Sequence, residues 1–106
     1  MKKILGQNFL INDSIAKKIV ELANFCQDDE IIEIGPGNGS LTDHLLIYHN
    51  KLTLLEIDFN LIKKLKIKYR NYNLKIINED ARFFKITGDK DRSIIGNLPY
   101  YASNKI

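Results

Sequence analysis

Cysteine is nearly absent from this sequence, because Cys26 is the only one among 106 residues. A single cysteine forms no internal disulfide and builds no cysteine-based zinc site, and we expect its thiol to be buried and inert. Long apolar runs are also lacking, since none approaches the roughly 20 residues that a membrane span needs. The first residues, 1–6, include two lysines but no long apolar stretch typical of a secretory signal. These absences predict a cytoplasmic protein without membrane association.

Histidine is scarce as well. His44 and His49 flank a short apolar segment, and neither has a third ligand or a carboxylate pair beside it in the sequence. Protein metal sites combine three or four such ligands. We therefore predict no metal site, and we expect both histidines at the surface or at helix ends.

What is present is the composition of one globular domain, with 44% hydrophobic and 27% charged residues. The net charge of +3 mildly favours an anionic partner. Positive charge is concentrated at 63–70, and apolar residues recur at every fourth position over the same stretch, at Leu61, Leu65 and Tyr69. This spacing favours an amphipathic helix whose lysines face solvent over an RNA contact by the same lysines.

The chain alternates between helical and strand-like segments. Helices are predicted at 14–25, 41–48 and 59–70, strands at 31–34, 52–55, 74–77 and 93–96, and a polar loop at 87–92. Asn12 or Asp13 can cap the first helix, and its apolar face comprises Ile15, Ile19, Leu22 and Ala23. Such alternation predicts a parallel, doubly wound α/β sheet, in which ligands bind beyond the carboxyl ends of the strands.

Residues able to bind or react with a ligand follow each predicted strand. The first strand runs into the glycine-rich segment 35–39, the second ends at Glu56, the third leads to Asp80, and the fourth leads to 97–100. In a parallel sheet these segments lie along one edge, where the fold places its ligands. The sequence therefore predicts one binding site made of all four.

Glycines alternate in the first of these segments, at Gly35, Gly37 and Gly39. Glycine there permits positive φ and close approach of a ligand to the backbone. A dinucleotide fingerprint would need a third glycine at position 40, which is Ser40 here. The spacing instead resembles the first motif of Rossmann-like methyltransferases, although a glycine-rich turn also occurs without a ligand.

The carboxylates after the second and third strands suit an adenosine. Glu56 can accept hydrogen bonds from both ribose hydroxyls, a role that would serve a nicotinamide cofactor equally well. Asp80 can accept a hydrogen bond from an adenine amino group, or it can be an ordinary helix cap or loop residue. Residue types alone leave these two readings of Asp80 open.

The segment 97–100 suggests the reaction. The N6 amino group of adenine is a poor nucleophile because its lone pair is delocalised into the ring. The Asn97 amide oxygen and the Leu98 carbonyl could accept hydrogen bonds from that amino group, with Pro99 making the loop rigid and Tyr100 stacking on an extruded base. In-line methyl transfer from a sulfonium then needs alignment and electrostatics, without a covalent intermediate. An ordinary turn after the fourth strand is the alternative.

Five segments together resemble the ribosomal RNA adenine N6 dimethyltransferase family: 6–10, 33–42, 56–58, 80–81 and 97–100. They resemble in particular the branch of the family that modifies two adjacent adenosines near the 3′ end of small-subunit rRNA. The resemblance implies a Rossmann-like S-adenosylmethionine-dependent fold without a metal. It implies catalysis by Asn97, Leu98, Pro99 and Tyr100. It also implies cofactor binding by Asn8, Leu10, Gly35, Gly37, Gly39, Glu56, Ile57, Asp80, Ala81 and Asn97.

The resemblance also implies a partner, a small-subunit rRNA or pre-30S particle, and no stable protein partner. Family members continue with further strands and a small helical rRNA-binding domain, so we expect 1–106 to be the amino-terminal part of the cofactor-binding domain, with its sheet incomplete at the carboxyl end. Ala102 and Lys105 depart from the family's usual residues. Two alternatives stay open: a large-subunit methyltransferase of the macrolide-resistance type, and a non-catalytic RNA-binding or ribosome-assembly module. A nicotinamide-binding protein would leave Ser40 and 97–100 unexplained.

Overall fold

The computed structural model describes residues 12–84 and 92–96. In chain order the elements are α1 (Asp13–Ala23), β1 (Glu30–Ile34), α2 (Ser40–Tyr48), β2 (Leu52–Glu56), α3 (Phe59–Lys68), β3 (Lys75–Asn78), the short 3-10 helix η2 (Ala81–Phe83) and β4 (Arg92–Gly96). The predicted helices and strands all appear, with ends displaced by one or two residues. Arg92 begins β4 instead of ending a loop, and the rest of the predicted loop, 87–91, lies outside the described residues.

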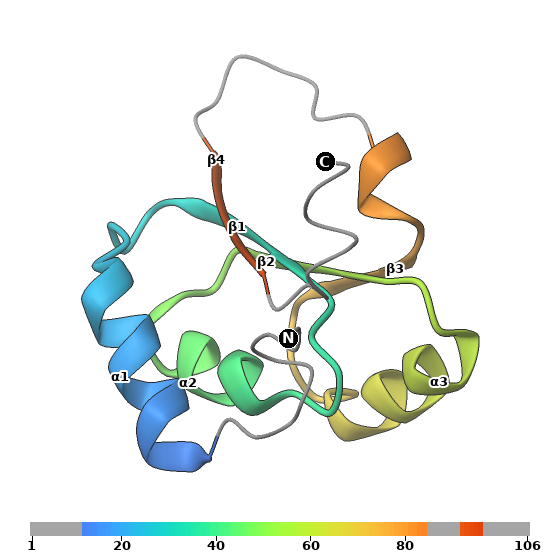
Figure 1. Ribbon diagram of the computed structural model, residues 1–106, viewed down its shortest axis with the longest axis horizontal. Helices are drawn as coiled ribbons and strands as arrows, with labels where there is room; N and C mark the ends of the chain where they lie inside the picture. The colour runs from blue at the N-terminus through green and yellow to red at the C-terminus, as the bar shows by residue number, and fades with distance from the viewer. Residues whose placement is uncertain (1–11, 85–91, 97–106) are drawn as a thin grey trace, which may run out of the picture.

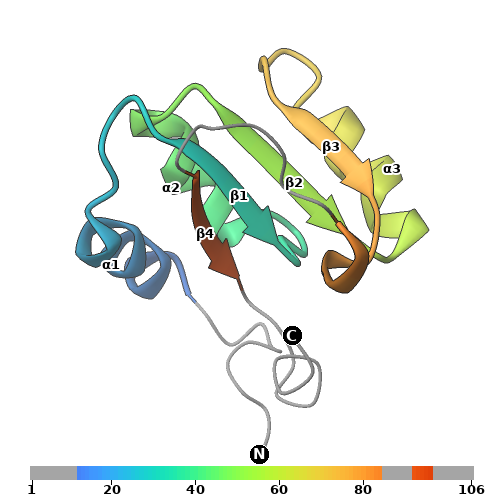
Figure 2. The same cartoon turned by 90° about the horizontal axis from the view of Figure 1, so that it is seen from above.

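The strands form one parallel sheet in the order β3-β2-β1-β4 (Figure 2). From β1 the chain moves outward through α2 to β2 and through α3 to β3, and β4 then pairs with the other side of β1. Right-handed crossovers place connections running in opposite directions on opposite faces of a sheet. Accordingly, Figure 1 shows the three α-helices below the sheet and η2, in orange, above it. The predicted doubly wound arrangement is confirmed, and the strand order reverses between β1 and β4.

The core lies between the sheet and the three helices. β2 is buried along almost its whole length because it is an inner strand with neighbours on both edges, and Leu54 at its centre is completely enclosed. Leu45 from α2 and Leu65 from α3 pack into the same cluster. Burying such side chains stabilises the fold by roughly 2 kcal/mol each. This packing fixes the strand ends relative to one another.

The apolar face predicted for α1 is confirmed at Ile19, which packs against the core, and is wrong at Ile15 and Leu22. Ala16 and Val20 are the buried residues, whereas Ile15 is 47% exposed and Leu22 is 78% exposed. Ile15 and Leu22 form one stripe with helical spacing, and Ala16 and Val20 form another. Because α1 packs beside α2, the smaller side chains of Ala16 and Val20 face the core. Asn12 is the N-cap, as expected, and its side chain accepts a hydrogen bond from the Ile15 N–H at 2.8 Å.

Helix α3 shows the predicted division into two faces. Ile62, Leu65 and Tyr69 are buried, and Leu61 is only partly so. The lysines at 63, 64 and 66 are exposed to solvent, in agreement with their interpretation as a solvent-facing surface. The Asp58 side chain caps the start of the helix by accepting from the N–H groups of the next turn.

Two expectations about scarce residues need correction, those for Cys26 and His44. Cys26 is exposed, because α1 has already ended and the turn leading to β1 lies at the surface. His44 is buried and its Nε2 lies 2.8 Å from the Asp13 carboxylate, which links α2 to α1. His49 does end α2, yet it is buried against the Phe25 ring, with centroids 6.2 Å apart. No helix in the described ranges is long and apolar enough to cross a membrane.

Candidate functional site

The carboxyl ends of the strands bring the predicted segments together. The segment 35–39 directly follows β1, and the ends of β2 and β4 flank it, since Ile34 pairs with Leu55 on one side and Gly96 on the other. The candidate site therefore lies where the strand order reverses. Asn8, Leu10 and the catalytic candidates Asn97, Leu98, Pro99 and Tyr100 fall outside the described residues, so their roles remain predictions.

The glycine loop (35–39) needs its glycines. Gly35, Gly37 and Gly39 have φ of 67°, 61° and 97°, a backbone region that residues other than glycine rarely adopt. A Cβ added at Gly37 would meet no atom within 4 Å, so the backbone there faces open space. A Cβ at Gly39 would instead collide with the Tyr69 hydroxyl. Gly37 thus leaves room for a ligand, whereas Gly39 leaves room for the side chain of Tyr69.

Glu56 links the glycine loop to the end of β2. Its carboxylate is buried, accepting a hydrogen bond from the Gly37 N–H at 3.3 Å through Oε1 and from the Asp58 N–H at 2.9 Å through Oε2. Each carboxylate oxygen can accept a second hydrogen bond. The predicted neighbourhood of Glu56 and the glycine loop is therefore present, with the carboxylate fixed in position.

Asn78 holds the end of β3 in place and was not anticipated from the sequence. Its side-chain amide donates to the backbone carbonyls of Glu56 at 2.9 Å and Ile57 at 3.2 Å. Because both acceptors belong to the segment after β2, the contact fixes the position of the two strand ends. A polar residue closing an apolar strand was the only signal available.

Asp80 caps η2, which is one of its two predicted roles. Its carboxylate accepts from the Arg82 backbone N–H at 2.9 Å and pairs with the Arg82 guanidinium, with Nη2 and Oδ2 at 2.6 Å. The side-chain hydrogen bond from Arg82 lowers the pKa of Asp80, so it is a carboxylate near neutral pH. Contact with an adenine remains a prediction. Ala81, the next residue, begins η2.

Glu33 is a third carboxylate near the site, and the sequence interpretation treated it only as part of the first strand. It is buried in β1, and its Oε1 accepts from the Thr42 hydroxyl at 2.5 Å. Desolvation by burial raises the pKa of Glu33 to about 7, with the Thr42 hydrogen bond opposing and the charges of Asp43 and Glu56 adding to the increase. Its Oε2 has no hydrogen-bond partner within the described part of the chain. A charged residue in a buried strand, two positions before a glycine loop, was the available signal.

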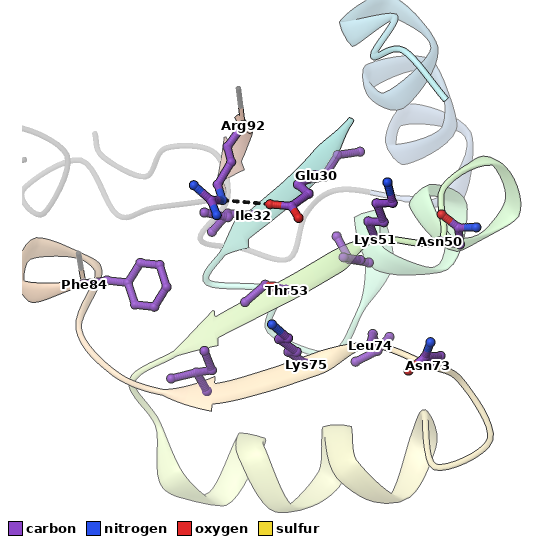
Figure 3. A pocket seen from close by; sticks show the side chains of 13 residues that line it. Glu30, Ile32, Asn50, Lys51, Thr53, Asn73, Leu74, Lys75, Phe84 and Arg92 are labelled. Atoms are coloured by element: carbon purple, nitrogen blue, oxygen red, sulfur yellow. Dashed lines mark ion pairs between the residues drawn. The ribbon is translucent and has the colours of Figure 1, made fainter. Parts of the chain in front are cut away.

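Residues 12–84 and 92–96 contain no group of three or more potential metal ligands. They do contain a hollow of about 390 Å³, lined by residues of all four strands and by Phe84. Figure 3 shows Phe84 and Ile32 beside it, with the Glu30–Arg92 ion pair, at 2.9 Å, crossing from β1 to β4. No residue of the glycine loop lines this hollow. It is therefore separate from the candidate site.

Comparisons with known proteins agree with this geometry. The ribosomal RNA adenine dimethylase family matches residues 1–106. Ribosomal RNA small subunit methyltransferase A of Mesomycoplasma hyopneumoniae (strain 232) is 50% identical over 105 residues, covering 99% of this chain and 40% of that protein. The chain thus spans about two fifths of the length of the curated relatives it matches.

Two solved structures are similar in fold and in sequence. The 23S rRNA methyltransferase ErmE superposes with a TM-score of 0.83 at 30% identity, covering 92% of this chain and 40% of that one. A dimethyladenosine transferase from Plasmodium falciparum gives 0.75 at 32% identity, covering 92% and 36%. The predicted Rossmann-like methyltransferase fold is confirmed. On the strength of the match over all of its residues, the chain belongs to the ribosomal RNA adenine dimethylase family.

Proposed function

We propose that this chain is the cofactor-binding part of an enzyme that methylates rRNA in ribosome biogenesis. In this proposal, methyl groups pass from S-adenosylmethionine to N6 of two adjacent adenosines near the 3′ end of small-subunit rRNA. The observation that carries it is the contact between Glu56 and the glycine loop at the point where the strand order reverses, in a chain of this family. The substrate would be the rRNA in a pre-30S particle in the cytoplasm, with no stable protein partner.

The described residues fit an adenosine-containing cofactor. Open space faces the backbone at Gly37, and the Glu56 carboxylate beside it has acceptor capacity for ribose hydroxyls. Ile57, which is 66% exposed next to Glu56, can cover one face of an adenine. The full set that we propose for the cofactor is Asn8, Leu10, Gly35, Gly37, Gly39, Glu56, Ile57, Asp80, Ala81 and Asn97.

When bound, the cofactor supplies a methyl group on a positively charged sulfur. The protein's task is to make N6 of adenine nucleophilic and to align it. We assign this to Asn97 and Leu98, whose amide and carbonyl oxygens would accept hydrogen bonds from the amino group, and to Pro99 and Tyr100, which would stiffen the loop and stack on the base. The amino group loses one proton for each methyl group that it gains.

Small-subunit rRNA is favoured over large-subunit rRNA by sequence. The relative named for the small subunit is 50% identical to this chain, whereas the 23S rRNA methyltransferase is 30% identical. Methylation of small-subunit particles and of naked large-subunit rRNA by the full-length protein, using labelled cofactor, separates the two substrates. Transfer to the large-subunit RNA alone would replace the proposed substrate. RNA binding without any transfer would favour a non-catalytic assembly module.

Cofactor binding is tested by calorimetry on the folded chain. We expect S-adenosylmethionine to bind in the micromolar range and Glu56→Ala to weaken binding at least about tenfold, because hydrogen bonds to a charged group are worth roughly 1.5–3 kcal/mol each. Glu21→Ala, on the exposed side of α1, is the matched control and should bind as the parent does. A folded parent that binds no S-adenosylmethionine would refute the proposal.

A further inference from the structure

The last turn of α3 and the residue after it contact the glycine loop. Tyr69 is buried, and its hydroxyl lies 2.7 Å from Asp43 Oδ1 and 3.3 Å from the Gly39 carbonyl oxygen. Lys68 Nζ donates to the Asn38 carbonyl at 2.9 Å and to Asp43 Oδ2 at 3.2 Å. Two consecutive loop carbonyls and both oxygens of one carboxylate in α2 are thus held by two consecutive side chains.

These contacts orient the peptide groups of the loop. In a trans peptide the C=O and the following N–H point in opposite directions. The Gly39 carbonyl accepts a hydrogen bond from the Asp43 N–H at 2.9 Å and also faces the Tyr69 hydroxyl. Because the carbonyl points into the helix, the Ser40 N–H of the same peptide group points out of the amino end of α2. The first N–H groups of a helix have no partner within it and attract ligand oxygens. Tyr69 therefore acts on the side of the peptide away from the ligand.

The Tyr69 hydroxyl also occupies the space next to Gly39, since a Cβ built there would lie 2.1 Å from it. The loop and the ring are therefore packed against each other with no room for another side chain. Burial, followed by the hydrogen bond to Asp43, raises the pKa of Tyr69, so the phenol keeps its donor proton. The hydroxyl has a single proton, which it directs mainly at the nearer Asp43 Oδ1 and shares with the Gly39 carbonyl, so Tyr69 ties the loop to Asp43 of α2.

We propose that Tyr69 and Lys68 are positioning residues that hold the glycine loop in its cofactor-binding conformation through the carbonyls of Asn38 and Gly39. This inference rests on the proposed function, because it assumes that the loop binds S-adenosylmethionine. Neither residue touches the cofactor. Their loss reduces the fraction of molecules with a competent loop, and apparent affinity falls in proportion to that fraction.

The test compares Tyr69→Phe with Tyr72→Phe. The first variant keeps the buried ring and removes the hydroxyl, whereas Tyr72 is 55% exposed and stacks edge-on against Tyr69 without reaching the loop. Calorimetry with S-adenosylmethionine should show about tenfold weaker binding by Tyr69→Phe, and parental binding by Tyr72→Phe. Lys68→Met should weaken binding severalfold, with substantial recovery in Lys68→Arg, which retains a cationic donor.

Amide hydrogen exchange without cofactor separates local positioning from general stability. The Gly39 N–H donates to the Pro36 carbonyl at 2.9 Å, and the Ile62 N–H donates to the carbonyl of Asp58, the N-cap of α3, at 3.0 Å. We expect Tyr69→Phe to speed exchange at Gly39 and Asp43 about tenfold, with little change at Ile62. Equal acceleration at all three amides would overturn the proposal, as would parental affinity and parental exchange. If the parent binds no cofactor but Gly39 exchange responds as expected, the proposed function fails and the role of Tyr69 in holding the loop stands.

Discussion

Replacing Glu33 with glutamine should change how the stability of this protein depends on pH. Glu33 is 1% exposed, and the raised pKa of about 7 compares with an ordinary value of 4.5. Burial is the largest cause, and the negative charges of Asp43 and Glu56 act in the same direction against the Thr42 hydrogen bond. The folded chain therefore retains a proton that the unfolded chain releases.

The sign follows from the two pKa values. Below 4.5 Glu33 is protonated in both states and contributes no pH dependence to the free energy of unfolding. As pH rises from 4.5 to about 7, the unfolded state loses the proton first, so stability falls by about 1.4 kcal/mol per pH unit. The accumulated loss reaches about 3 kcal/mol above the folded pKa. Glu33→Gln has no proton to release and escapes this loss, while its amide oxygen can still accept from Thr42.

Urea unfolding followed by circular dichroism, at several pH values between about 5 and 8, measures the effect. The free energy of unfolding of Glu33→Gln should exceed that of the parent by a margin that grows with pH and levels off near pH 8. Glu21→Gln, an exposed carboxylate of α1, should run parallel to the parent throughout. A constant difference between Glu33→Gln and the parent over this range would show that Glu33 ionises normally in the folded state.

The order of helices and strands could be predicted because each strand is a short apolar run closed by glycine or polar residues. The parallel topology of the first three strands followed because one helix-like segment separates the first strand from the second and another separates the second from the third. The buried face of α1 could not be predicted in the same way. Ile15 and Leu22 form a stripe as regular as that of Ala16 and Val20, and packing beside α2 selects the second.

The candidate site was predictable only where it lies close to the strand ends. The glycine loop and Glu56 could be placed together because β1 and β2 are neighbours. Tyr69 could not be assigned to the site, since its partners Gly39 and Asp43 are 30 and 26 residues away in sequence. The exposed and buried faces of α3 were visible from periodicity, but which loop its last turn would contact depends on the three-dimensional packing alone.

Four further substitutions test the packing and the backbone of the fold, each by urea unfolding. Leu54→Ala, at a fully enclosed position, should lower the free energy of unfolding by about 2–5 kcal/mol, and a loss below about 1 kcal/mol would contradict its place in the core. Asn12→Ala should cost about 1 kcal/mol by removing the cap of α1, whereas Asn50→Ala, outside any helix, should cost less. Gly37→Ala and Gly39→Ala should differ sharply although both glycines have positive φ. An alanine at 37 meets open space and suffers only backbone strain of about 1–2 kcal/mol, but its methyl group should impede the cofactor. An alanine at 39 has the same kind of strain and must also displace the buried Tyr69 ring, at a further cost of about 1–3 kcal/mol. Equal destabilisation by the two alanines would mean that the Tyr69 ring does not constrain the loop.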